Sequence, residues 1–434
     1  MKSAKPNNGK NSFLKQYDQA PADEKFSLVR NWMDKSPLPF FEELRAKKPI
    51  FATAKGTLFA KFEDVVEILT LPSVFTVGLY EPKMEGYLMA EDDTALHMRE
   101  KSIMQAMLNR DDLPRIRDLI AERSRDTLAA SGHRIELVNS YCRTIPTLLV
   151  QEYFGLDDID PAKLIKWSYW SQYDSFHNQP FDKVDDPDAI HANSLQARDE
   201  IRAYLGELIP RRLAQIQAGT AKDDIVTRML STRFPDSIDF PMDRLGRNIG
   251  GLLIGAVETT AQAVAQIIQE ILRRPDVLKL AKAAIQADDV QAFDSIVWEA
   301  LRFNPIAPYL FRISASDYTV AQGTKRETFI PKGTMVLPLV LSAMFDPDRF
   351  PDPYEFNPAR PWYNTFHFGF GLHECLGKHI GMVMIPEMVK QVIMLPGIQA
   401  DSPAIDYKET PFPEFYQVSW DNDNDSCSNI FQVL

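Results

Sequence analysis

The ten residues Phe368–Gly377 read FGFGLHECLG and hold three glycines, one histidine and one cysteine, followed at once by a helical pattern. A thiolate, not a thiol, binds metals or attacks electrophiles. The glycines let backbone approach a large flat group, and a helix starting near Leu376 would lower the pKa of the Cys375 thiol. Spacing alone leaves three interpretations open: a metal ligand, a catalytic nucleophile that needs its own base, or a buried structural cysteine.

Three pairs of polar residues elsewhere in the chain are spaced so that the two residues of each pair lie close together. Glu258 and Thr259 are adjacent in GAVETT, inside a long helical pattern, where a threonine hydroxyl can disturb helical hydrogen bonds and hold water. The other two pairs share one helix face each, and they are Glu299 with Arg302 and His97 with Lys101. Taken singly, each pair is more typical of a solvated helix surface than of a site.

The glycine-rich segment resembles the haem-binding loop of the cytochrome P-450 superfamily. Every fixed position of F-G-x-G-x-H-x-C-x-G is met between Phe368 and Gly377. The resemblance implies haem b as cofactor, with Cys375 as the proximal thiolate ligand of the iron. It further implies that Phe368 shields the sulfur and that His373 and Gly377 belong to the cofactor site.

The polar pairs match that family in order along the chain. Glu299-x-x-Arg302, with the downstream Arg360, is similar to the family's buried structural triad. Glu258-Thr259 is similar to its acid–alcohol pair, which relays protons during oxygen activation. The family commonly has His-x-x-x-Arg at His97, so Lys101 is a departure that keeps the charge and loses the guanidinium fork. The resemblance assigns contacts with the haem propionates to these residues: His97, Lys101, Arg312 and His373.

The resemblance implies a haem-thiolate monooxygenase that inserts one oxygen atom from O2 into a C–H bond. No nucleotide-binding, flavin or iron–sulfur motif is evident, so we expect a separate ferredoxin- or flavodoxin-type electron donor docking near Lys378 and His379. Expected pocket residues are apolar and favour a terpenoid, steroid, fatty acid or aromatic substrate: Phe75, Leu88, Ile254, Val257, Ile306 and Ala307. The alternatives are a peroxide-driven peroxygenase, a redox-neutral isomerase or dehydratase, and a haem carrier or sensor.

The elements that must position these residues are mostly helices. Helical patterns dominate the first two-thirds, and a long helix is predicted from Asp243 to Arg274. A hairpin turn is predicted at Lys55-Gly56, and β-like alternation is found in residues 309–320, in residues 327–341 and in the last forty residues. The predicted fold is mainly α with small sheets, the family's fold with the long central helix over the haem. We expect a disordered tail over residues 1–20, an apolar loop over 73–92 that covers a ligand, and one catalytic domain over 21–434.

The composition excludes several classes of protein. The 434-residue chain has a net charge of −12, which argues against nucleic-acid or anionic-membrane binding. Three unclustered cysteines exclude a disulfide framework. The polar N-terminus lacks a secretory signal, and the most apolar stretch is too polar to span a membrane, so it is predicted to be a core helix. We therefore expect a cytoplasmic monomer without membrane insertion.

Overall fold

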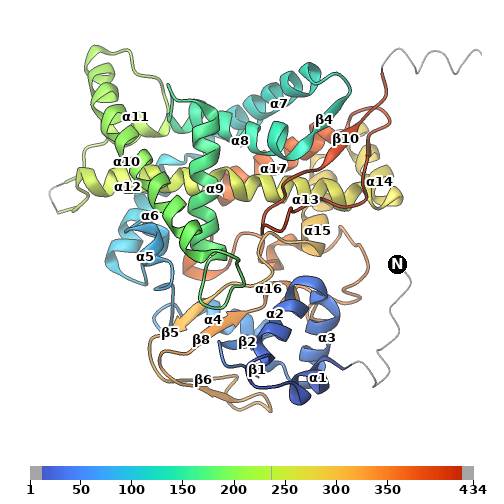
Figure 1. Ribbon diagram of the computed structural model, residues 1–434. Helices are drawn as coiled ribbons and strands as arrows, with labels where there is room; N and C mark the ends of the chain where they lie inside the picture. The colour runs from blue at the N-terminus through green and yellow to red at the C-terminus, as the bar shows by residue number, and fades with distance from the viewer. Residues whose placement is uncertain (1–11, 236, 423–434) are drawn as a thin grey trace, which may run out of the picture.

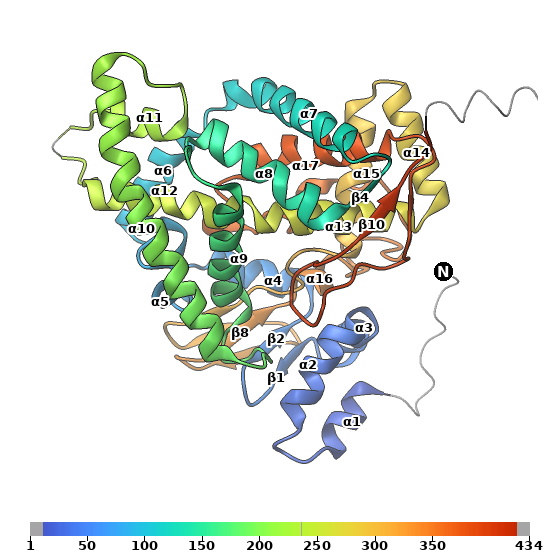
Figure 2. The same cartoon turned by 45° about the horizontal axis from the view of Figure 1, so that its top comes forward.

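A computed structural model describes residues 12–235 and 237–422. Its described part is mainly helical with three small sheets, as predicted. Figures 1 and 2 show most helices gathered around the central pair α12 and α13, with the N-terminal helices and the largest sheet on one side of this body. Buried apolar side chains form one continuous core that runs from Val29 to Val418.

The N-terminal helices begin earlier than expected. Helix α1 (Phe13–Gln19) is capped by Ser12, and it precedes α2 (Lys25–Lys35) and α3 (Pro37–Lys47). The Phe13 ring packs edge-on against Trp32 at 5.3 Å and Phe40 at 5.6 Å between ring centroids. The prediction of disorder is therefore wrong for residues 12–20, because a capped, aromatic-anchored helix forms there. Residues 1–11 of the predicted tail lie outside the described residues.

The largest sheet has the strand order β1-β2-β8-β5-β3. The predicted turn at Lys55-Gly56 joins β1 to β2 as a hairpin, and β8 runs parallel to β2. β5 pairs with β8 so that Arg312 lies opposite Val336, which fixes the Arg312 side chain beside the cavity described below. The strands of the three sheets are β1 (Ile50–Ala52), β2 (Thr57–Phe59), β8 (Met335–Pro338), β5 (Arg312–Ser314) and β3 (Phe75–Thr76); β4 (Arg134–Glu136), β10 (Gln417–Ser419) and β9 (Gln399–Ala400); β6 (Tyr318–Val320) and β7 (Thr328–Ile330).

The C-terminal part holds less strand than its alternation predicts. In the described part of the last forty residues, only β9 and β10 are strands, and the connection between them is a loop. Loop hydrogen bonds fold this connection back on itself, for example from the Thr410 hydroxyl to the carbonyl of Phe412 at 3.1 Å. The alternating side chains therefore line a loop and not a regular sheet.

The long central helix is divided into two. Helix α12 (Met242–Ala256) and helix α13 (Glu258–Leu272) meet at Val257, whose φ of −86° and ψ of −66° keep the chain in the right-handed helical region. By length and composition this stretch could cross a membrane, with a hydropathy of 1.3, yet 78% of its most apolar window is buried inside the protein. It crosses the middle of the molecule in Figure 1 as the predicted core helix.

The remaining helices surround this pair, and several start at a proline in the first turn, where its missing N–H costs nothing. Helix α9 lies against α12 and α13, and α17 lies on another side of α13 (Figures 1 and 2). Their bounds are α4 (Phe62–Thr70), α5 (Glu81–Met84), α6 (Ala95–Met107), α7 (Leu113–Ala130), α8 (Thr144–Leu149), α9 (Pro161–His177), α10 (Pro187–Ala218), α11 (Ile225–Ser231), α14 (Pro275–Gln286), α15 (Val290–Phe303), α16 (Val340–Ala343) and α17 (Lys378–Ile393). Short π-helical turns span Val138–Arg143 and Val150–Phe154, and short 3-10 turns span Leu88–Ala90, Arg110–Asp112, Trp362–Asn364 and Gly371–His373.

Candidate active site

The cysteine loop is a tight turn that ends at the start of α17. Gly369 and Gly371 both have φ of +73°, a conformation that favours glycine. At Gly371 a Cβ atom would lie 2.5 Å from the Leu69 carbonyl oxygen, so no larger residue fits without movement. The Cys375 N–H donates to the Phe368 carbonyl at 2.8 Å and closes the turn. The sequence therefore shapes this loop through its glycines, as predicted.

The Cys375 side chain faces a large cavity. The cavity has a volume of about 1210 Å³, and Cys375 and Gly377 are among its lining residues. Burial raises the pKa of the Cys375 thiol, while a hydrogen bond from the backbone of Gly377 and the charge of Lys101 lower it. The side chain's accessible surface opens into this cavity, so a ligand bound there could reach the sulfur.

Phe368 borders the same cavity as Cys375. Its ring lines the cavity and packs edge-on against Trp298 at 5.5 Å between centroids. A Cβ atom on Gly381 of α17 would come within 2.9 Å of this ring, so a glycine at that position is what admits it.

Unpaired donors gather beside the cysteine. The His97 and His373 rings lie 4.8 Å apart, and His97 Nδ1 donates to the Leu88 carbonyl at 2.7 Å. His97 Nε2 and both ring nitrogens of His373 are buried without a protein partner among the described residues. The buried Arg312 guanidinium also lines the cavity and donates to the Phe311 carbonyl at 2.7 Å. Buried polar groups need partners, so this donor set fits the two carboxylates of the haem that the sequence implies.

Lys101 lies near these residues but does not line the cavity. Its ammonium group donates to the Leu372 carbonyl and, at 2.8 Å, to the Glu374 carbonyl. The side chain is buried, with 9% of the residue exposed. Lys101 therefore holds two carbonyl groups of the cysteine loop, and its expected contact with a haem carboxylate stays a prediction.

The acid and the alcohol of GAVETT point in different directions. Thr259 lines the cavity, and its hydroxyl donates to the Gly255 carbonyl at 2.6 Å, one turn back. Glu258 is fully buried and does not line the cavity. Arg143 donates from Nε and Nη2 to the two carboxylate oxygens of Glu258, at 2.8 and 2.9 Å. Burial raises the pKa of the Glu258 carboxyl, and Arg143 opposes part of that rise.

The predicted structural triad does come together. Arg302 donates from two nitrogens to the carboxylate of Glu299, each at 2.8 Å. Arg360 Nε lies 3.4 Å from the same carboxylate, and the backbone N–H of Asn357 donates to it at 2.9 Å. Glu299 and Arg302 are buried, so each charge has the partners that burial demands.

Three of the six predicted pocket residues line the cavity. Ile254, Ile306 and Ala307 line it as predicted, together with side chains of the 73–92 segment such as Val77 and Tyr80. The other predicted wall residues lie in the core and not on the cavity, and they are Phe75, Leu88 and Val257. For Leu88 and Val257 the immediate neighbours Met89 and Ala256 line the cavity instead, because adjacent side chains of a helix face different ways. In place of Phe75 the cavity is lined by Val77, which follows the end of β3.

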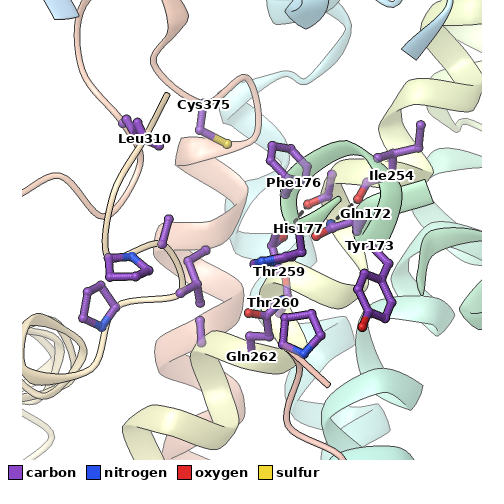
Figure 3. Close-up of a pocket in the computed structure, with 18 of the residues that line it drawn as sticks. Gln172, Tyr173, Phe176, His177, Ile254, Thr259, Thr260, Gln262, Leu310 and Cys375 are labelled. Atoms are coloured by element: carbon purple, nitrogen blue, oxygen red, sulfur yellow. Dashed lines mark hydrogen bonds between the residues drawn. The ribbon is translucent and has the colours of Figure 1, made fainter. Parts of the chain in front are cut away.

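Sequence reasoning missed two groups of residues. One is Arg143, the partner of Glu258, which sits in a segment without a recognisable motif. The other is a row of side chains on α9 that face the cavity in Figure 3, namely Gln172, Tyr173, Phe176 and His177. Their spacing over one and a half helical turns was the available signal, but the same spacing also fits an ordinary core face.

Known proteins resemble this chain over most of its length. The family model described as Cytochrome P450 matches residues 79–394. Pulcherriminic acid synthase of Bacillus subtilis (strain 168) is 25% identical over 395 residues, which cover 85% of this chain and 90% of that protein. Cytochrome P450 monooxygenase PikC of Streptomyces venezuelae is 28% identical over 296 residues, covering 67% of this chain and 64% of that protein. The solved structure of cytochrome P450 CYP109Q5 from Chondromyces apiculatus superposes with a TM-score of 0.74 at 18% identity, covering 89% and 96% of the two chains.

Proposed function

Because the chain belongs to the cytochrome P450 family and is a monooxygenase, we propose that it inserts one oxygen atom from O2 into a lipophilic small molecule. The observation that carries this proposal is that Cys375 and His373, whose ring nitrogens are unpaired, line one large cavity. The His97 ring lies behind His373, 4.8 Å from it between ring centroids, and is not on the cavity lining. The proposal includes haem b as cofactor, one catalytic domain over residues 21–434, and a cytoplasmic monomer.

The chain's own residues supply the cofactor site in this proposal. Cys375 would bind the iron, and Phe368 would keep water from the sulfur. His97, His373 and Arg312 would hold the carboxylates, while Lys101 would hold the loop. When bound, a haem with a thiolate ligand supplies the activation and cleavage of O2.

Glu258 and Thr259 would transfer protons to the reacting oxygen. The Thr259 hydroxyl is the group of the pair that borders the cavity, where it can hold a water or a substrate oxygen. Glu258 would act only after its carboxyl leaves Arg143 or exchanges a proton through intervening water, because Arg143 now occupies both carboxylate oxygens. Arg143 would thereby control the supply of protons to the Thr259 side.

Electrons would come from a separate ferredoxin- or flavodoxin-type protein. Lys378 and His379 follow the cysteine loop in the first turn of α17. The Lys378 ammonium lies 2.6 Å from Glu374 Oε1 and 5.6 Å from the centre of the Trp362 ring. An acidic electron-donor protein would bind at these two residues, Lys378 and His379, which follow the cysteine loop.

The decisive test compares Cys375→Ala with Cys142→Ala after supplementation with haem. The carbon monoxide difference spectrum of the reduced protein should show the thiolate-ligand band in wild type and Cys142→Ala, because Cys142 is fully buried elsewhere in the core. The band should vanish in Cys375→Ala. An unchanged spectrum in that variant would reject the assignment.

Turnover separates the proposed reaction from the alternatives. A monooxygenase should form product with a reductase system and O2, and hydrogen peroxide alone should support little product. Efficient turnover with peroxide alone would identify a peroxygenase, and conversion without any oxidant would identify an isomerase or dehydratase.

A further inference from the structure

The cavity has two unlike sides. Near Cys375 it is bordered by apolar residues such as Leu310 and Ile306. On the opposite side in Figure 3, side chains of α9 and α13 present polar groups. We define the polar wall as Tyr173 and His177 of α9, Gln262 and Gln266 of α13, and Tyr407 of the loop between β9 and β10, all of which line the cavity.

Ring contacts and a hydrogen bond connect four of these five residues through one loop. The Phe412 ring lies edge-on to His177 at 5.2 Å and to Tyr173 at 5.5 Å between centroids. In the same loop, the Tyr407 hydroxyl accepts a hydrogen bond from Gln266 Nε2 at 3.4 Å. The loop that carries Tyr407 and Phe412 therefore connects the α9 side of the polar wall to its α13 side.

The polar wall holds hydrogen-bonding atoms that the protein does not use. The Oε1 atom of Gln266 is buried without a partner among the described residues. In that same part of the chain, neither ring nitrogen of His177 nor the Gln262 amide makes a hydrogen bond. Gln262 and Gln266 are only 3% and 5% exposed. A buried polar atom without a partner destabilises a fold, so the Gln266 oxygen indicates a ligand on this wall, and the unused groups of His177 and Gln262 on the same cavity can bind it as well.

The cations around the cavity argue against a carboxylate as the ligand group that meets the polar wall. Arg30 borders the cavity, but it is paired with Tyr309 at 2.8 Å and with Asp34 at 3.2 Å. Burial and the nearby charge of Arg30 lower the pKa of His177 to about 4, so this imidazole is neutral near pH 7 and offers one donor and one acceptor. A buried carboxylate would need an unpaired cation. The lysines on the cavity's lining, Lys35, Lys183 and Lys408, are all exposed at its edge.

We propose that the polar wall is a subsite that binds a hydroxyl or carbonyl group of the substrate through His177 and Gln262. This inference rests on the proposed function, because it places the remainder of the substrate against the apolar side near Cys375. It narrows the substrate class to lipophiles that carry a hydroxyl or carbonyl group, and it excludes long-chain carboxylic acids as the preferred ligands. Both His177 and Gln262 can donate and accept, so the subsite serves alcohols and ketones alike.

Binding of matched ligand pairs to the haem-loaded enzyme tests the subsite. The pairs are menthol with p-menthane, 2-naphthol with naphthalene, and testosterone with 5α-androstane, with palmitic acid as the carboxylate. Dissociation constants come from the Soret shift, or from calorimetry where no shift occurs. Each is measured for wild type, His177→Phe and Gln262→Leu, with Lys408→Met as the control at the exposed edge.

In at least one pair the oxygenated member should bind wild type about tenfold tighter than its hydrocarbon, the effect of one well-formed buried hydrogen bond. His177→Phe or Gln262→Leu should reduce that ratio to within about threefold of unity, and Lys408→Met should leave it unchanged. The inference is overturned if no oxygenated member binds, if every pair binds equally, if the preference survives both variants, or if palmitic acid binds most tightly.

These failures differ from a failure of the proposed function. Each preparation is first required to show the thiolate-ligand band of its reduced carbon monoxide complex. A protein without that band rejects the haem-thiolate assignment. A protein with the band but without the ligand preference rejects only the subsite.

Discussion

Arg143 holds Glu258 by both carboxylate oxygens, in a fully buried pair that joins two distant segments of the chain. The same guanidinium donates to the Pro413 carbonyl at 3.1 Å and lies 3.2 Å from the Glu414 carboxylate. Glu414 also accepts from the Tyr169 hydroxyl of α9 at 3.0 Å. Because α9 and the β9–β10 loop both border the cavity, the acid of the central helix is physically linked to the elements that would contact a substrate.

Replacing Arg143 with methionine should destabilise the protein in a pH-dependent way. The change leaves the buried Glu258 carboxylate unpaired, which costs about 3–5 kcal/mol of the free energy of unfolding when it is charged. Loss of the guanidinium raises the Glu258 pKa further, since Arg143 is the group that lowers it. A raised pKa favours folding at low pH and loses that contribution as pH rises through it. Denaturant unfolding should therefore show a smaller deficit relative to wild type near about pH 5 than near about pH 8.

The double variant Arg143→Met with Glu258→Gln is the control for this interpretation. Removing the charge as well as its partner should recover stability near about pH 8 relative to Arg143→Met alone. A deficit of equal size at both pH values would show that Arg143 acts by packing or through Glu414 and not through the Glu258 charge.

Replacing Thr259 with alanine should separate cofactor binding from catalysis. The hydroxyl borders the cavity, and its only described hydrogen bond joins α13 to the end of α12, at the Gly255 carbonyl. It bonds to none of the residues proposed to hold the haem, so haem loading and the Soret band should be unchanged. Product formed per electron consumed should fall by about tenfold or more, with hydrogen peroxide appearing instead, since positioned proton transfer contributes at least that much. The conservative variant Thr259→Ser should retain most of the coupling. Tightly coupled turnover in the alanine variant would remove Thr259 from the relay.

Replacing Lys101 with methionine should loosen the cysteine loop. The variant leaves the Leu372 and Glu374 carbonyls without the ammonium donor, and each buried carbonyl left unpaired costs about 1–3 kcal/mol. Both the free energy of unfolding of the haem-free protein and the retention of haem should decrease. Ser102→Ala is the matched control, because Ser102 is exposed and its hydroxyl bonds only within the same helix, to Met98. Unaltered haem-free stability in Lys101→Met would mean that the loop holds its shape without this residue.

The sequence predicted the parts of the site that depend on local geometry. The turn around Cys375 follows from glycines at fixed spacing, and the Glu299–Arg302 contact follows from two positions on one helix face. The central helix was also predicted, together with a disturbance of its hydrogen bonds by a threonine hydroxyl. The Thr259 hydroxyl does donate to Gly255 across Val257, the residue at which the helix divides.

Tertiary partners could not be predicted in the same way. Arg143 meets Glu258 across 115 positions of sequence, and nothing in its own segment distinguishes it from a surface arginine. The resemblance assigned Lys101 to a haem carboxylate, but it could not predict the contacts with the Leu372 and Glu374 carbonyls, because these depend on how α6 packs against the cysteine loop. The polar wall could not be predicted from the sequence, because a glutamine or tyrosine in a helical pattern does not indicate which face of the helix borders a cavity.

Replacing Gly371 with alanine should test how strictly the cysteine loop is shaped. Alanine at φ +73° costs about 1–2 kcal/mol from conformation alone. At this position the new Cβ would also lie 2.5 Å from the Leu69 carbonyl, so the turn or α4 must move. The matched control is Gly323→Ala, where φ is +76° and nothing lies within 4 Å of the new atom. Gly371→Ala should therefore lose more unfolding free energy than Gly323→Ala, and it alone should weaken haem retention, because a displaced loop misplaces the Cys375 sulfur. Equal losses in the two variants would show that only backbone conformation matters and that the close approach to Leu69 is relieved without moving the loop.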